Sequence, residues 1–584
     1  MSKLVGKLKM MKSAYVRVFN NFSQKMSLMV MLGYVLVLLS SFVESVYFFE
    51  FMLWDLNSLS FSVNLLLDSL SMMFLGTILI ISGSVLMYCY WYMDDEKNFY
   101  RFMYLVYLFV GSMMFMILIP NLVTLLIGWD GLGLTSFLLV AHYQNNKSLS
   151  GSLLTALTNR IGDGLILASI SLWAVNESGW VLYNFESQFV NFYFILALIF
   201  GGMTKSAQMP FCAWLPAAMA APTPVSSLVH SSTLVTAGVY LLIRSYPVIK
   251  GSLFLMTSLK FLSLFTLVLA SSVAINCFDM KKIIALSTLS QLSVMMFSLS
   301  HGLVSISFFH LVMHALFKAL LFLTAGAVIH SLKGCQDIRS MGGCWSILPS
   351  SMVCMFIANC SLSGLPFMSG FYSKDMILDL MFNSSVNFWC FMIIMPGLML
   401  TSFYSMRMVW MVCFGSNKVS ISTLCLKEPK SLLIPYSLLA VGAVFLGGVL
   451  TPMSECLFSY RSSSASEMGT LGVLFVFGIS YVGLISVSSK FGKDFRGLFS
   501  FLFSMWFLEL LTHGVKKCFF DVSGTILKSC DKGMLETVGP KGLYSFCMKL
   551  SSYNENFQSD YFLKGMLFFS SFFIGALSFL FFWN

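Results

Sequence analysis

The chain has 584 residues, of which 58% are hydrophobic and only 10% charged, and its mean hydropathy is +0.83. This composition, with a net charge of +10, excludes an ordinary soluble domain and indicates a protein that lies in lipid. The 14 cysteines form no C-x-x-C pair and no Cys/His cluster, and no glycine-rich phosphate loop occurs. We therefore expect no metal, cofactor or nucleotide site on this chain, and no nucleic-acid partner.

Apolar stretches long enough to cross a bilayer recur along the whole chain, and we count about 15, since a spanning helix needs about 20 mostly apolar residues. None shows the ten-residue alternation of a barrel strand, so helices are the remaining way to pair the backbone in hydrocarbon. The predicted fold is an all-α polytopic membrane protein. The stretches lie near 27–43, 63–93, 99–119, 121–141, 153–175, 192–209, 225–246, 253–277, 283–299, 303–330, 347–366, 387–414, 432–451, 470–488, 498–512 and 561–583.

The first 25 residues are basic and hold no acid. Their charged side chains are Lys3, Lys7, Lys9, Lys12, Arg17 and Lys25. One interpretation is an amphipathic transit peptide. The other, which we favour, is a retained basic arm on the negatively charged side of the membrane.

Ionisable residues inside apolar stretches are costly, so each is a functional candidate. Asp130 lies in Gly-Trp-Asp-Gly-Leu-Gly-Leu (128–134), where glycines permit close helix approach; a helix-start cap is the alternative. Arg160 and Asp163 are three residues apart on one helix face, and structural pairing is their expected role.

Lys205 ends an apolar stretch in Gly-Met-Thr-Lys-Ser-Ala-Gln-Met-Pro (202–210), and a proline-rich segment continues from there to His230. Proline removes a helix hydrogen bond, so this pattern indicates a broken helix of the kind that lines a watery cavity in transporters. A desolvated lysine there can carry a proton reversibly. The alternative is a lysine near a helix end whose side chain extends toward the membrane–water interface.

His310, His314 and Lys318 are four residues apart and predict a titratable stripe along one helix face. Such a stripe can pass protons through bridging water. Lys374, followed by Asp375, lies beside a second Gly/Pro interruption at 364–370. Its likeness to the Lys205 segment suggests an internal repeat of two bundles, each with a broken, lysine-bearing helix.

After about residue 490 the pattern changes to a single apolar stripe with charges opposite it, which predicts a long amphipathic helix over 505–538 that Pro540 ends. A pair of short spans joined by a loop is the alternative. The apolar positions are Leu508, Leu511, Val515, Phe519, Val522, Ile526, Cys530, Met534 and Val538. The opposing charges are Lys516, Lys517, Asp521, Lys528, Lys532 and Glu536.

Four blocks carry a family resemblance: 202–211, 221–230, Ser-Thr-Leu-Ser-Gln-Leu (287–292) and Phe-His-Leu-Val-Met-His-Ala-Leu-Phe-Lys-Ala-Leu-Leu-Phe-Leu (309–323). Over roughly 63–415 the chain resembles the chain 5 family of NADH–ubiquinone oxidoreductase, and more widely the antiporter-like family shared with multi-subunit sodium/proton antiporters. The Trp-Asp-Gly-Leu-Gly-Leu block and the long tail favour chain 5 over the chain 4 and chain 2 families.

The resemblance implies two inverted five-helix antiporter-like bundles and a lateral helix along the membrane arm of respiratory complex I. It places Asp130, in the position of a family glutamate, as the partner of Lys205. Relatives have two spans before the block near 64–68, whereas we find one, which would put the basic arm on the matrix side. The implied regions are 1–25 (arm), 26–120 (N-terminal helices), 121–246 and 253–415 (bundles), 430–490 (further helices), 491–560 (lateral helix region) and 561–584 (anchor).

The resemblance also implies the function of a core subunit in the mitochondrial inner membrane, with electron transfer from NADH to ubiquinone coupled to proton translocation. Flavin, iron–sulfur clusters and ubiquinone would bind partner subunits, and the neighbours along the lateral helix would be the chain 4 and chain 2 subunits and membrane lipids. Two alternatives remain: a sodium/proton antiporter subunit and a non-conducting structural subunit. The predicted relay residues are Asp130, Lys205, His230, His310, His314, Lys318 and Lys374, supported by Arg160, Asp163 and Asp375.

Overall fold

A computed structural model describes residues 24–43, 45–56, 59–94, 96–176, 191–383, 388–416, 428–451, 501–502, 504–559 and 562–581. The chain divides into two compact units, Met1–Trp506 and Phe507–Asn584. Nearly all of the predicted basic arm (1–25) and the predicted stretch near 470–488 lie outside the described residues.

The first unit is a helical bundle. Its helices include Gln24–Ser40, α2 (Ser69–Tyr92), α3 (Phe99–Leu118), α4 (Leu122–Val140), α5 (Asn146–Asn176), α6 (Phe192–Lys205), α7 (Trp214–Ala217), α8 (Thr223–Val225), η4 (Ser226–Thr233), α9 (Leu234–Arg244), α11 (Leu253–Asn276), α12 (Met280–Ser300), α13 (Val304–Ser331), α15 (Pro349–Ser363), α16 (Ser369–Asn383), α17 (Phe388–Val409) and α18 (Leu433–Val441).

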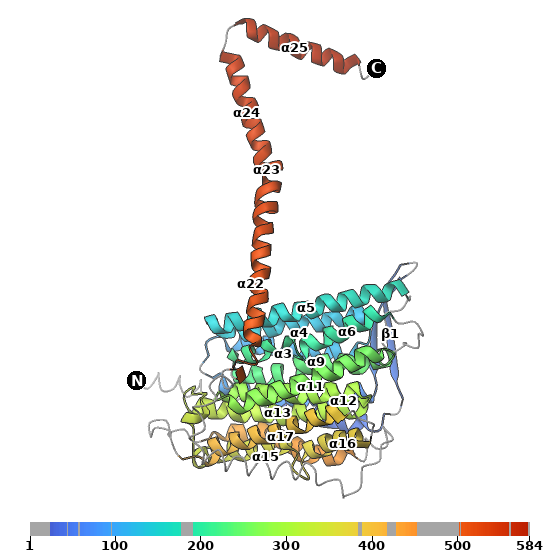
Figure 1. Cartoon of the computed structure of the whole chain (residues 1–584), viewed down its shortest axis with the longest axis vertical. Helices are drawn as coiled ribbons and strands as arrows, with labels where there is room; N and C mark the ends of the chain where they lie inside the picture. Colours follow the sequence, from blue (N-terminus) through green and yellow to red (C-terminus); the bar gives the residue numbers. More distant parts are fainter. Residues whose placement is uncertain are drawn as a thin grey trace, which may run out of the picture. The chain divides into compact units, whose positions relative to one another are not determined.

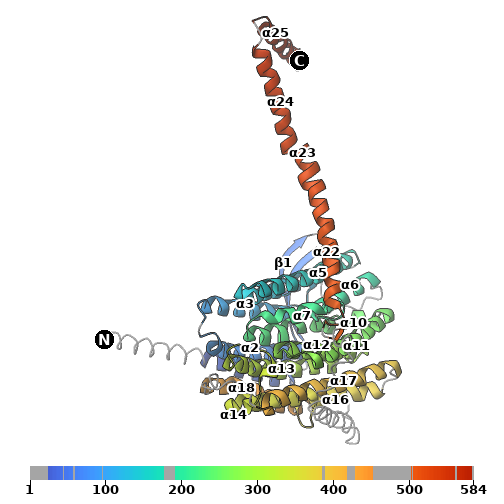
Figure 2. The ribbon, with the colours of Figure 1, turned by 60° about the vertical axis from the view of Figure 1, so that its left-hand side comes forward.

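In the described part of the chain, 11 helices are long and apolar enough to cross a membrane, and three shorter apolar helices accompany them. The predicted polytopic helical fold is confirmed. In the first unit, α3, α4 and α5 lie on one side and α15, α16 and α17 on the other, with α12 and α13 between them (Figures 1 and 2). The membrane-length windows of α12 and α13 are wholly buried, whereas those of α3 and α4 are less than half buried. The centre of this unit is therefore shielded from lipid on all sides.

One element departs from the predicted helices. Strands β1 (Tyr47–Leu56) and β2 (Leu59–Leu67) form an antiparallel hairpin in which Tyr47 faces Leu67 and Phe51 faces Val63. The aromatic and branched side chains of this segment favour a pleated strand. The predicted span at 63–93 is therefore wrong over its first residues.

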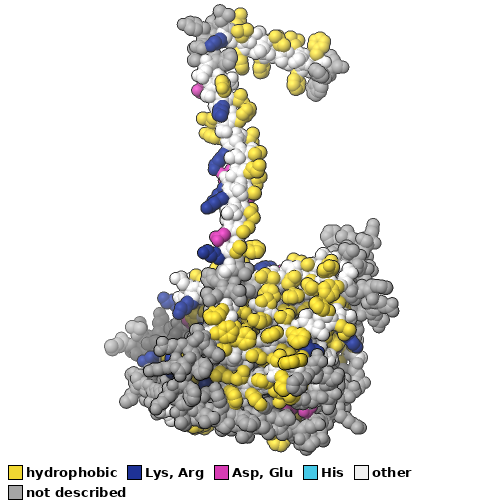
Figure 3. Space-filling model, in the orientation of Figure 1, with side chains coloured by type: hydrophobic (Ala, Val, Ile, Leu, Met, Phe, Trp, Pro, Cys, Tyr) yellow, Lys and Arg dark blue, Asp and Glu magenta, His cyan; other side chains and the backbone are white. Residues whose placement is uncertain are grey.

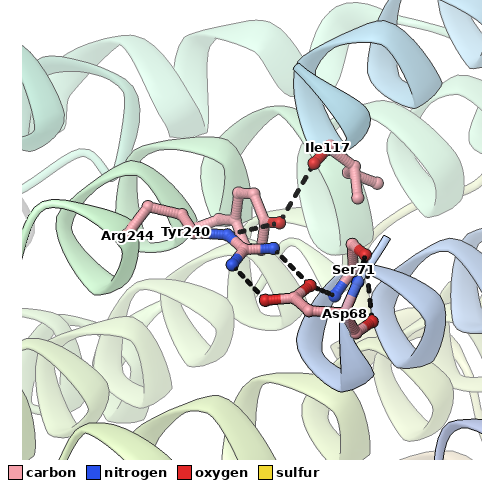
Figure 4. A network of polar contacts seen from close by, with 5 residues as sticks. All are labelled: Asp68, Ser71, Ile117, Tyr240 and Arg244. Atoms are coloured by element: carbon pink, nitrogen blue, oxygen red, sulfur yellow. Dashed lines mark hydrogen bonds and ion pairs between the residues drawn. The ribbon is translucent and has the colours of Figure 1, made fainter. Parts of the chain in front are cut away.

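The helix α2 begins only at Ser69, because Asp68 caps it. The backbone N–H of Ser71 donates to the Asp68 carboxylate at 2.8 Å, and the backbone N–H of Asp68 donates to the Ser71 hydroxyl at 2.9 Å. The Asp68 carboxylate also accepts two hydrogen bonds from Arg244, at the end of α9, at 2.5 and 2.8 Å (Figure 4). Arg244 also donates to the Tyr240 hydroxyl, which donates to the Ile117 carbonyl of α3. One network thus joins α2, α3 and α9.

Two interruptions shape the interior. The helix α6 ends at Lys205 and short helical turns follow before η4, a π-helix that continues into α9. The helix α15 ends at Ser363 and is followed by Gly364, whose φ of 85° is accessible to glycine without strain. The next helix, α16, begins at Ser369 after Pro366. Both predicted helix breaks are confirmed.

The helix Gln24–Ser40 runs antiparallel to α2. A Cβ on Gly33 would lie 2.7 Å from the Gly76 carbonyl, and one on Gly83 would lie 2.6 Å from the Val30 side chain. This helix therefore starts at the same end of the bundle at which α2 finishes, next to the C-terminal end of α13. Among the described residues only this helix precedes the hairpin; the prediction of a single span there also concerns residues 1–23, which lie outside the described residues.

The second unit contains α22 (Leu508–Ile526), η10 (Leu527–Leu535), α23 (Glu536–Val538), α24 (Pro540–Ser559) and α25 (Phe562–Phe581). The predicted amphipathic helix at 505–538 is present from Leu508, and its apolar side chains form a stripe opposite the charged ones (Figure 3). Pro540 ends it, as predicted, and also starts the next helix. The predicted span at 498–512 is wrong, because residues 504–507 form a turn with positive φ at Met505, Trp506 and Phe507.

Candidate functional site

Lys205 is wholly buried at the C-terminal end of α6. Its ammonium donates to the backbone carbonyl of Trp129 on α4 at 2.7 Å. It also lies 3.6 Å from the centroid of the Trp129 ring. The contacts between α6 and α4 therefore hold the cation with a carbonyl dipole and an aromatic face.

The acids near Lys205 are arranged around Trp129. The Trp129 indole N–H donates to the Asp163 carboxylate at 2.8 Å, and Arg160 pairs with Asp163 at 3.2 Å and with Asp130 at 3.5 Å. The predicted pairing of Arg160 with Asp163 is confirmed. Asp130 pairs with Arg160, and the structure places no ion pair between Asp130 and Lys205 among the described residues.

The helix geometry of α4 explains why Asp130 is more exposed than Trp129. Neighbouring residues on a helix point about 100° apart. Trp129 is directed inward and is fully buried, while the Asp130 side chain is 41% exposed and its partner Arg160 is 55% exposed. The Asp163 side chain, which is 11% exposed, is more buried than this outer pair.

The predicted stripe on α13 is confirmed as a set of wholly buried side chains. His310 lies 2.8 Å from the Ser373 hydroxyl on α16 and 3.2 Å from the Gln291 amide oxygen on α12. Lys318 donates to the Ser287 hydroxyl at 2.5 Å. His314 lies between them, with ring centroids of the two histidines 6.4 Å apart. The stripe is therefore bordered by hydroxyl and amide groups of α12 and α16.

The second broken helix brings Lys374 into the same interior. Its ammonium donates to the Thr401 hydroxyl on α17 at 3.1 Å, and its side chain is buried. Asp375 is also buried, and neither of its carboxylate oxygens has a hydrogen-bond partner among the described residues. The α16 segment thus carries two adjacent buried ionisable groups.

His230 lies on η4 between the Lys205 segment and α13. It is fully buried, and neither ring nitrogen has a hydrogen-bond partner among the described residues. Its ring is 6.1 Å from that of Trp214, whose N–H donates to the Thr204 carbonyl at 3.0 Å. Trp214 therefore links the end of α6 to His230 by direct contact.

Sequence reasoning missed the neutral partners of the buried cations. Ser287 and Gln291 lie four residues apart on α12, so both face α13. They lie in the Ser-Thr-Leu-Ser-Gln-Leu block, whose polar residues inside an apolar helix were the available signal. Lys281 was also missed: it is buried and donates to the Ala221 carbonyl at 3.0 Å.

The arrangement is a line of buried, exchangeable groups with neutral hydrogen-bond partners, in a bundle of broken helices. Such a line can move protons along side chains and intervening water. It defines the class: an antiporter-like, polytopic membrane subunit with a polar axis through its centre.

Comparisons with known proteins agree with this class. Residues 120–401 match the family model "NADH:quinone oxidoreductase/Mrp antiporter, TM", residues 54–103 match "NADH-Ubiquinone oxidoreductase (complex I), chain 5 N-terminus", and residues 404–582 match "NADH dehydrogenase subunit 5 C-terminus". The NADH-ubiquinone oxidoreductase chain 5 of Mytilus edulis is 53% identical over 551 residues, 92% of this chain and 94% of that protein.

More distant relatives cover nearly as much of the chain. The chain 5 proteins of Lumbricus terrestris and Aedes aegypti are each 42% identical, and the alignments cover 86% and 90% of this chain and 88% and 92% of theirs. A solved Mrp complex from Dietzia sp. DQ12-45-1b matches with a TM-score of 0.71 over 86% of this chain and 57% of that one. At 24% identity, that match shows the fold alone.

The chain belongs to the NADH-ubiquinone oxidoreductase chain 5 family. It is a core membrane-arm subunit of complex I and a multi-pass protein of the mitochondrial inner membrane.

Proposed function

We propose that this chain carries protons across the inner membrane by a relay in which Lys205, Lys318 and Lys374 exchange protons in turn. His230, His310 and His314 connect the three lysines, and Asp163, with Arg160 and Asp130 behind it, sets the charge around Lys205. The relay couples to electron transfer from NADH to ubiquinone within complex I.

The observation that carries this proposal is the environment of the three lysines. Each ammonium is buried and donates to a neutral oxygen, of Trp129, Ser287 or Thr401. A buried ammonium is costly to keep charged without a counter-charge. Each lysine can therefore be stable in its neutral form and accept a proton when a neighbouring charge changes.

The charge cluster at Lys205 supports a gating role for the acids. With Lys205 protonated, the two acids Asp130 and Asp163 balance the two bases Arg160 and Lys205. When the proton leaves, one negative charge is uncompensated, and the cluster attracts the next cation. Asp163 contacts Trp129 directly and is closest to the lysine site, so we assign it the larger influence and Asp130 the smaller one.

The exposed side of this cluster supports a partner interface. Asp130 lies on the spanning helix α4 and Arg160 on the spanning helix α5, and Ile127, Leu134 and Leu157 on the same helices are also exposed. A half-exposed ion pair is expensive in hydrocarbon. We propose that the adjacent chain 4 subunit covers this face, with the chain 2 subunit beyond it, and that the amphipathic helix of the second unit runs along both, in contact with membrane lipids.

The redox chemistry is assigned to partner subunits. We propose that flavin, iron–sulfur clusters and ubiquinone bind other chains of the complex, and that this chain contributes proton translocation without a redox or nucleotide site of its own. The isolated cysteines and the lack of a phosphate-binding loop in the sequence support this division.

The sodium/proton antiporter alternative rests on a shared fold alone, because the Mrp complex is 24% identical to this chain. The two candidates differ in partners. Purification of this chain in its assembled state, followed by absorbance spectroscopy for flavin and iron–sulfur clusters, distinguishes them, since complex I contains both groups.

The direct test replaces the relay lysines in the assembled complex. For Lys205→Ala and Lys318→Ala we expect assembly to persist and NADH-driven proton pumping, measured with a pH-sensitive dye in sealed vesicles, to fall several-fold. Lys282→Ala is the matched control, because Lys282 is exposed and pairs with Asp279, which is also exposed, at 3.1 Å. Normal pumping by both relay variants in an assembled complex would show that the relay is wrong.

A further inference from the structure

The turn that follows Lys205 is a helix cap with an unusual residue at its centre. The backbone N–H of Gln208 donates to the Met203 carbonyl at 3.1 Å, which is the bond that closes a Schellman cap. Between Lys205 and Gln208, Ala207 has a φ of 53°. Glycine is the usual residue at this left-handed position. Lys205 is therefore the last helical residue before a turn that its own sequence does not favour.

A left-handed residue that carries a Cβ is costly and persists where the surroundings hold it. Ala207 is fully buried, so the protein around it fixes the turn. One fixed point is the Trp214 indole N–H, which donates to the Thr204 carbonyl in the last turn of α6. A second fixed point comes from the side chain of Gln208.

Gln208 joins the turn to α11. Its side-chain oxygen accepts from the Thr266 hydroxyl at 2.6 Å, and its amide nitrogen donates to the Ser206 carbonyl at 3.4 Å. The Thr266 hydroxyl also lies 2.8 Å from the Ser263 carbonyl of its own helix. Gln208 and Thr266 are both buried. One end of the amide thus contacts the turn and the other end contacts a neighbouring helix.

This hydrogen bond connects the Lys205 segment to the first helix of the predicted second bundle. The next residue of α11, Leu267, packs against α17, because a Cβ on Gly397 would lie 2.6 Å from the Leu267 side chain. The same helix α17 carries Thr401, whose hydroxyl accepts from Lys374. The helix α11 therefore contacts both the Lys205 turn and the helix that binds Lys374.

The direction of the Lys205 side chain depends on this turn. From the last position of α6, its ammonium donates to the Trp129 carbonyl at 2.7 Å and lies over the Trp129 ring. A displacement of ~1 Å would carry the ammonium beyond hydrogen-bond distance of that carbonyl. The contact between base and carbonyl is therefore sensitive to small movements of the helix end.

We infer that Gln208 is a positioning residue for Lys205, which it holds against Trp129 by fixing the turn at Ala207 to Thr266 of α11. Its effect on pumping rests on the proposed relay. A movement of α11 is transmitted to Lys205 through this one buried hydrogen bond, so the second bundle can influence the protonation site of the first.

The first test measures the turn itself and does not depend on pumping. Hydrogen–deuterium exchange of the backbone amides in 203–211 is read by mass spectrometry in the assembled complex. For Thr266→Val, which keeps the shape and removes the hydroxyl, we expect exchange several-fold faster than in the wild type. For Thr266→Ser, which keeps the hydroxyl, we expect nearly wild-type exchange.

Thr257→Val is the matched control for this test. Thr257 is an exposed residue of the same helix, and its hydroxyl donates to the Phe254 carbonyl of that helix at 2.8 Å. We expect wild-type exchange in 203–211 for this variant. Exchange in Thr266→Val no faster than in Thr257→Val would overturn the role of Gln208.

The second test removes the strain of the turn. Glycine adopts a positive φ without strain, so Ala207→Gly combined with Thr266→Val is expected to return exchange toward the wild-type rate. Ala197→Gly, a change at a buried helical position of α6, should not do so in the same background. Equal exchange in the two double variants would contradict the idea that Gln208 holds a strained turn.

Pumping tests whether the turn acts through Lys205. For Gln208→Leu and Thr266→Val we expect normal assembly and a several-fold lower proton pumping per NADH, with Thr266→Ser close to the wild type. Gln208→Leu combined with Lys205→Ala should pump no less than Lys205→Ala alone, because the side chain to be positioned is gone. A further several-fold loss in that double variant would show that Gln208 acts elsewhere.

The positioning role and the relay fail differently. If Lys205→Ala lowers pumping while Gln208→Leu and Thr266→Val pump normally, the positioning role is wrong and the relay stands. If Lys205→Ala pumps normally, the relay is wrong, and the exchange rates in 203–211 still decide whether Gln208 fixes the turn.

Discussion

Trp129 is the residue on which the Lys205 site is built. Its carbonyl and ring face the ammonium, and its indole N–H holds Asp163 at 2.8 Å, so one side chain connects the buried cation to the acid. A substitution of Trp129 keeps the backbone carbonyl that accepts from Lys205, but it removes the indole N–H that donates to Asp163. Removal of the indole nitrogen alone would therefore disconnect Asp163 from the Lys205 site.

For Trp129→Phe we expect the Asp163 carboxylate to lose its buried donor, at a cost of about 1–3 kcal/mol. Proton pumping should fall while NADH oxidation by an artificial electron acceptor, which bypasses the membrane arm, stays unchanged. Trp345→Phe is the control, because Trp345 is 41% exposed. Equal pumping by the two variants would contradict the role assigned to Trp129.

Sequence reasoning located the charged residues and the pair of Arg160 with Asp163, but not the partners of the buried lysines. Arg160 and Asp163 follow from spacing on one helix, and the α13 stripe follows from its period of four. The partners of Lys205, Lys318 and Lys374 lie on other helices, at sequence separations of 76, 31 and 27 residues. No periodicity in one chain encodes which helices meet. For the same reason, family resemblance placed Asp130 near Lys205 but could not predict that its carboxylate pairs with Arg160.

At the scale of helices, the ion pair between Asp68 and Arg244 joins α2 to α9, and both side chains are nearly buried, at 11% and 12% exposed. Burial alone would raise the pKa of Asp68. The hydrogen bonds and the charge of Arg244, with the Ser71 N–H, reverse this and hold that pKa below its ordinary value. The pair therefore stabilises the fold only while the carboxylate is ionised.

For Asp68→Asn we expect a loss of about 3–5 kcal/mol, because Arg244 is left buried and unpaired. The measurement is the melting temperature of the assembled complex or the amount of complex on native gels. Asp279→Asn, which breaks an exposed pair, should cost below about 1 kcal/mol.

The same ion pair predicts a pH dependence. A carboxyl group with a lowered folded pKa contributes stability above its unfolded pKa of about 4, and this contribution is lost as the pH falls through the folded value. The wild-type complex should therefore lose stability in acid more steeply than the Asp68→Asn complex. Parallel melting curves from pH 7 down to acid would contradict this assignment.

The contact between α6 and α9 depends on glycine. A Cβ on Gly238 would lie 2.3 Å from the Gly202 carbonyl and 2.9 Å from the Ser206 N–H, both backbone atoms. Gly238→Ala must move α6 and with it Lys205, so we expect reduced assembly and pumping. Gly164→Ala meets nothing within 4 Å and should be neutral or stabilising, by up to ~1 kcal/mol. Equal assembly of the two complexes would show that this contact does not position Lys205.

For the whole molecule, the helical fold followed from hydropathy, because the cost of unpaired backbone in lipid leaves few solutions. The hairpin at 47–67 was missed, since its apolar residues merge with those of α2 and only the Asp68 cap separates them. The turn at 504–507 was missed because Met505, Trp506 and Phe507 carry no glycine or proline to mark it.

The second unit provides a prediction about assembly. Phe519, Val522 and Ile526 are 77%, 53% and 54% exposed along the apolar stripe of α22. Replacing all three with serine should reduce incorporation of this chain into complex I on native gels, because the stripe would no longer pack on neighbouring subunits or lipid. Replacing Lys517, Asp521 and Lys528 on the charged face with serine is the control, for which we expect near-normal incorporation.

The half-exposed pair of Arg160 and Asp130 has a consequence for the stability of the newly synthesised, unassembled subunit. If a neighbouring subunit covers α4 and α5 as proposed, a lone copy presents this ion pair on a spanning surface, which is costly in lipid, and we expect such copies to be degraded faster than assembled ones. The residues that surround Lys205 in the mature complex would then also set the half-life of the unassembled subunit.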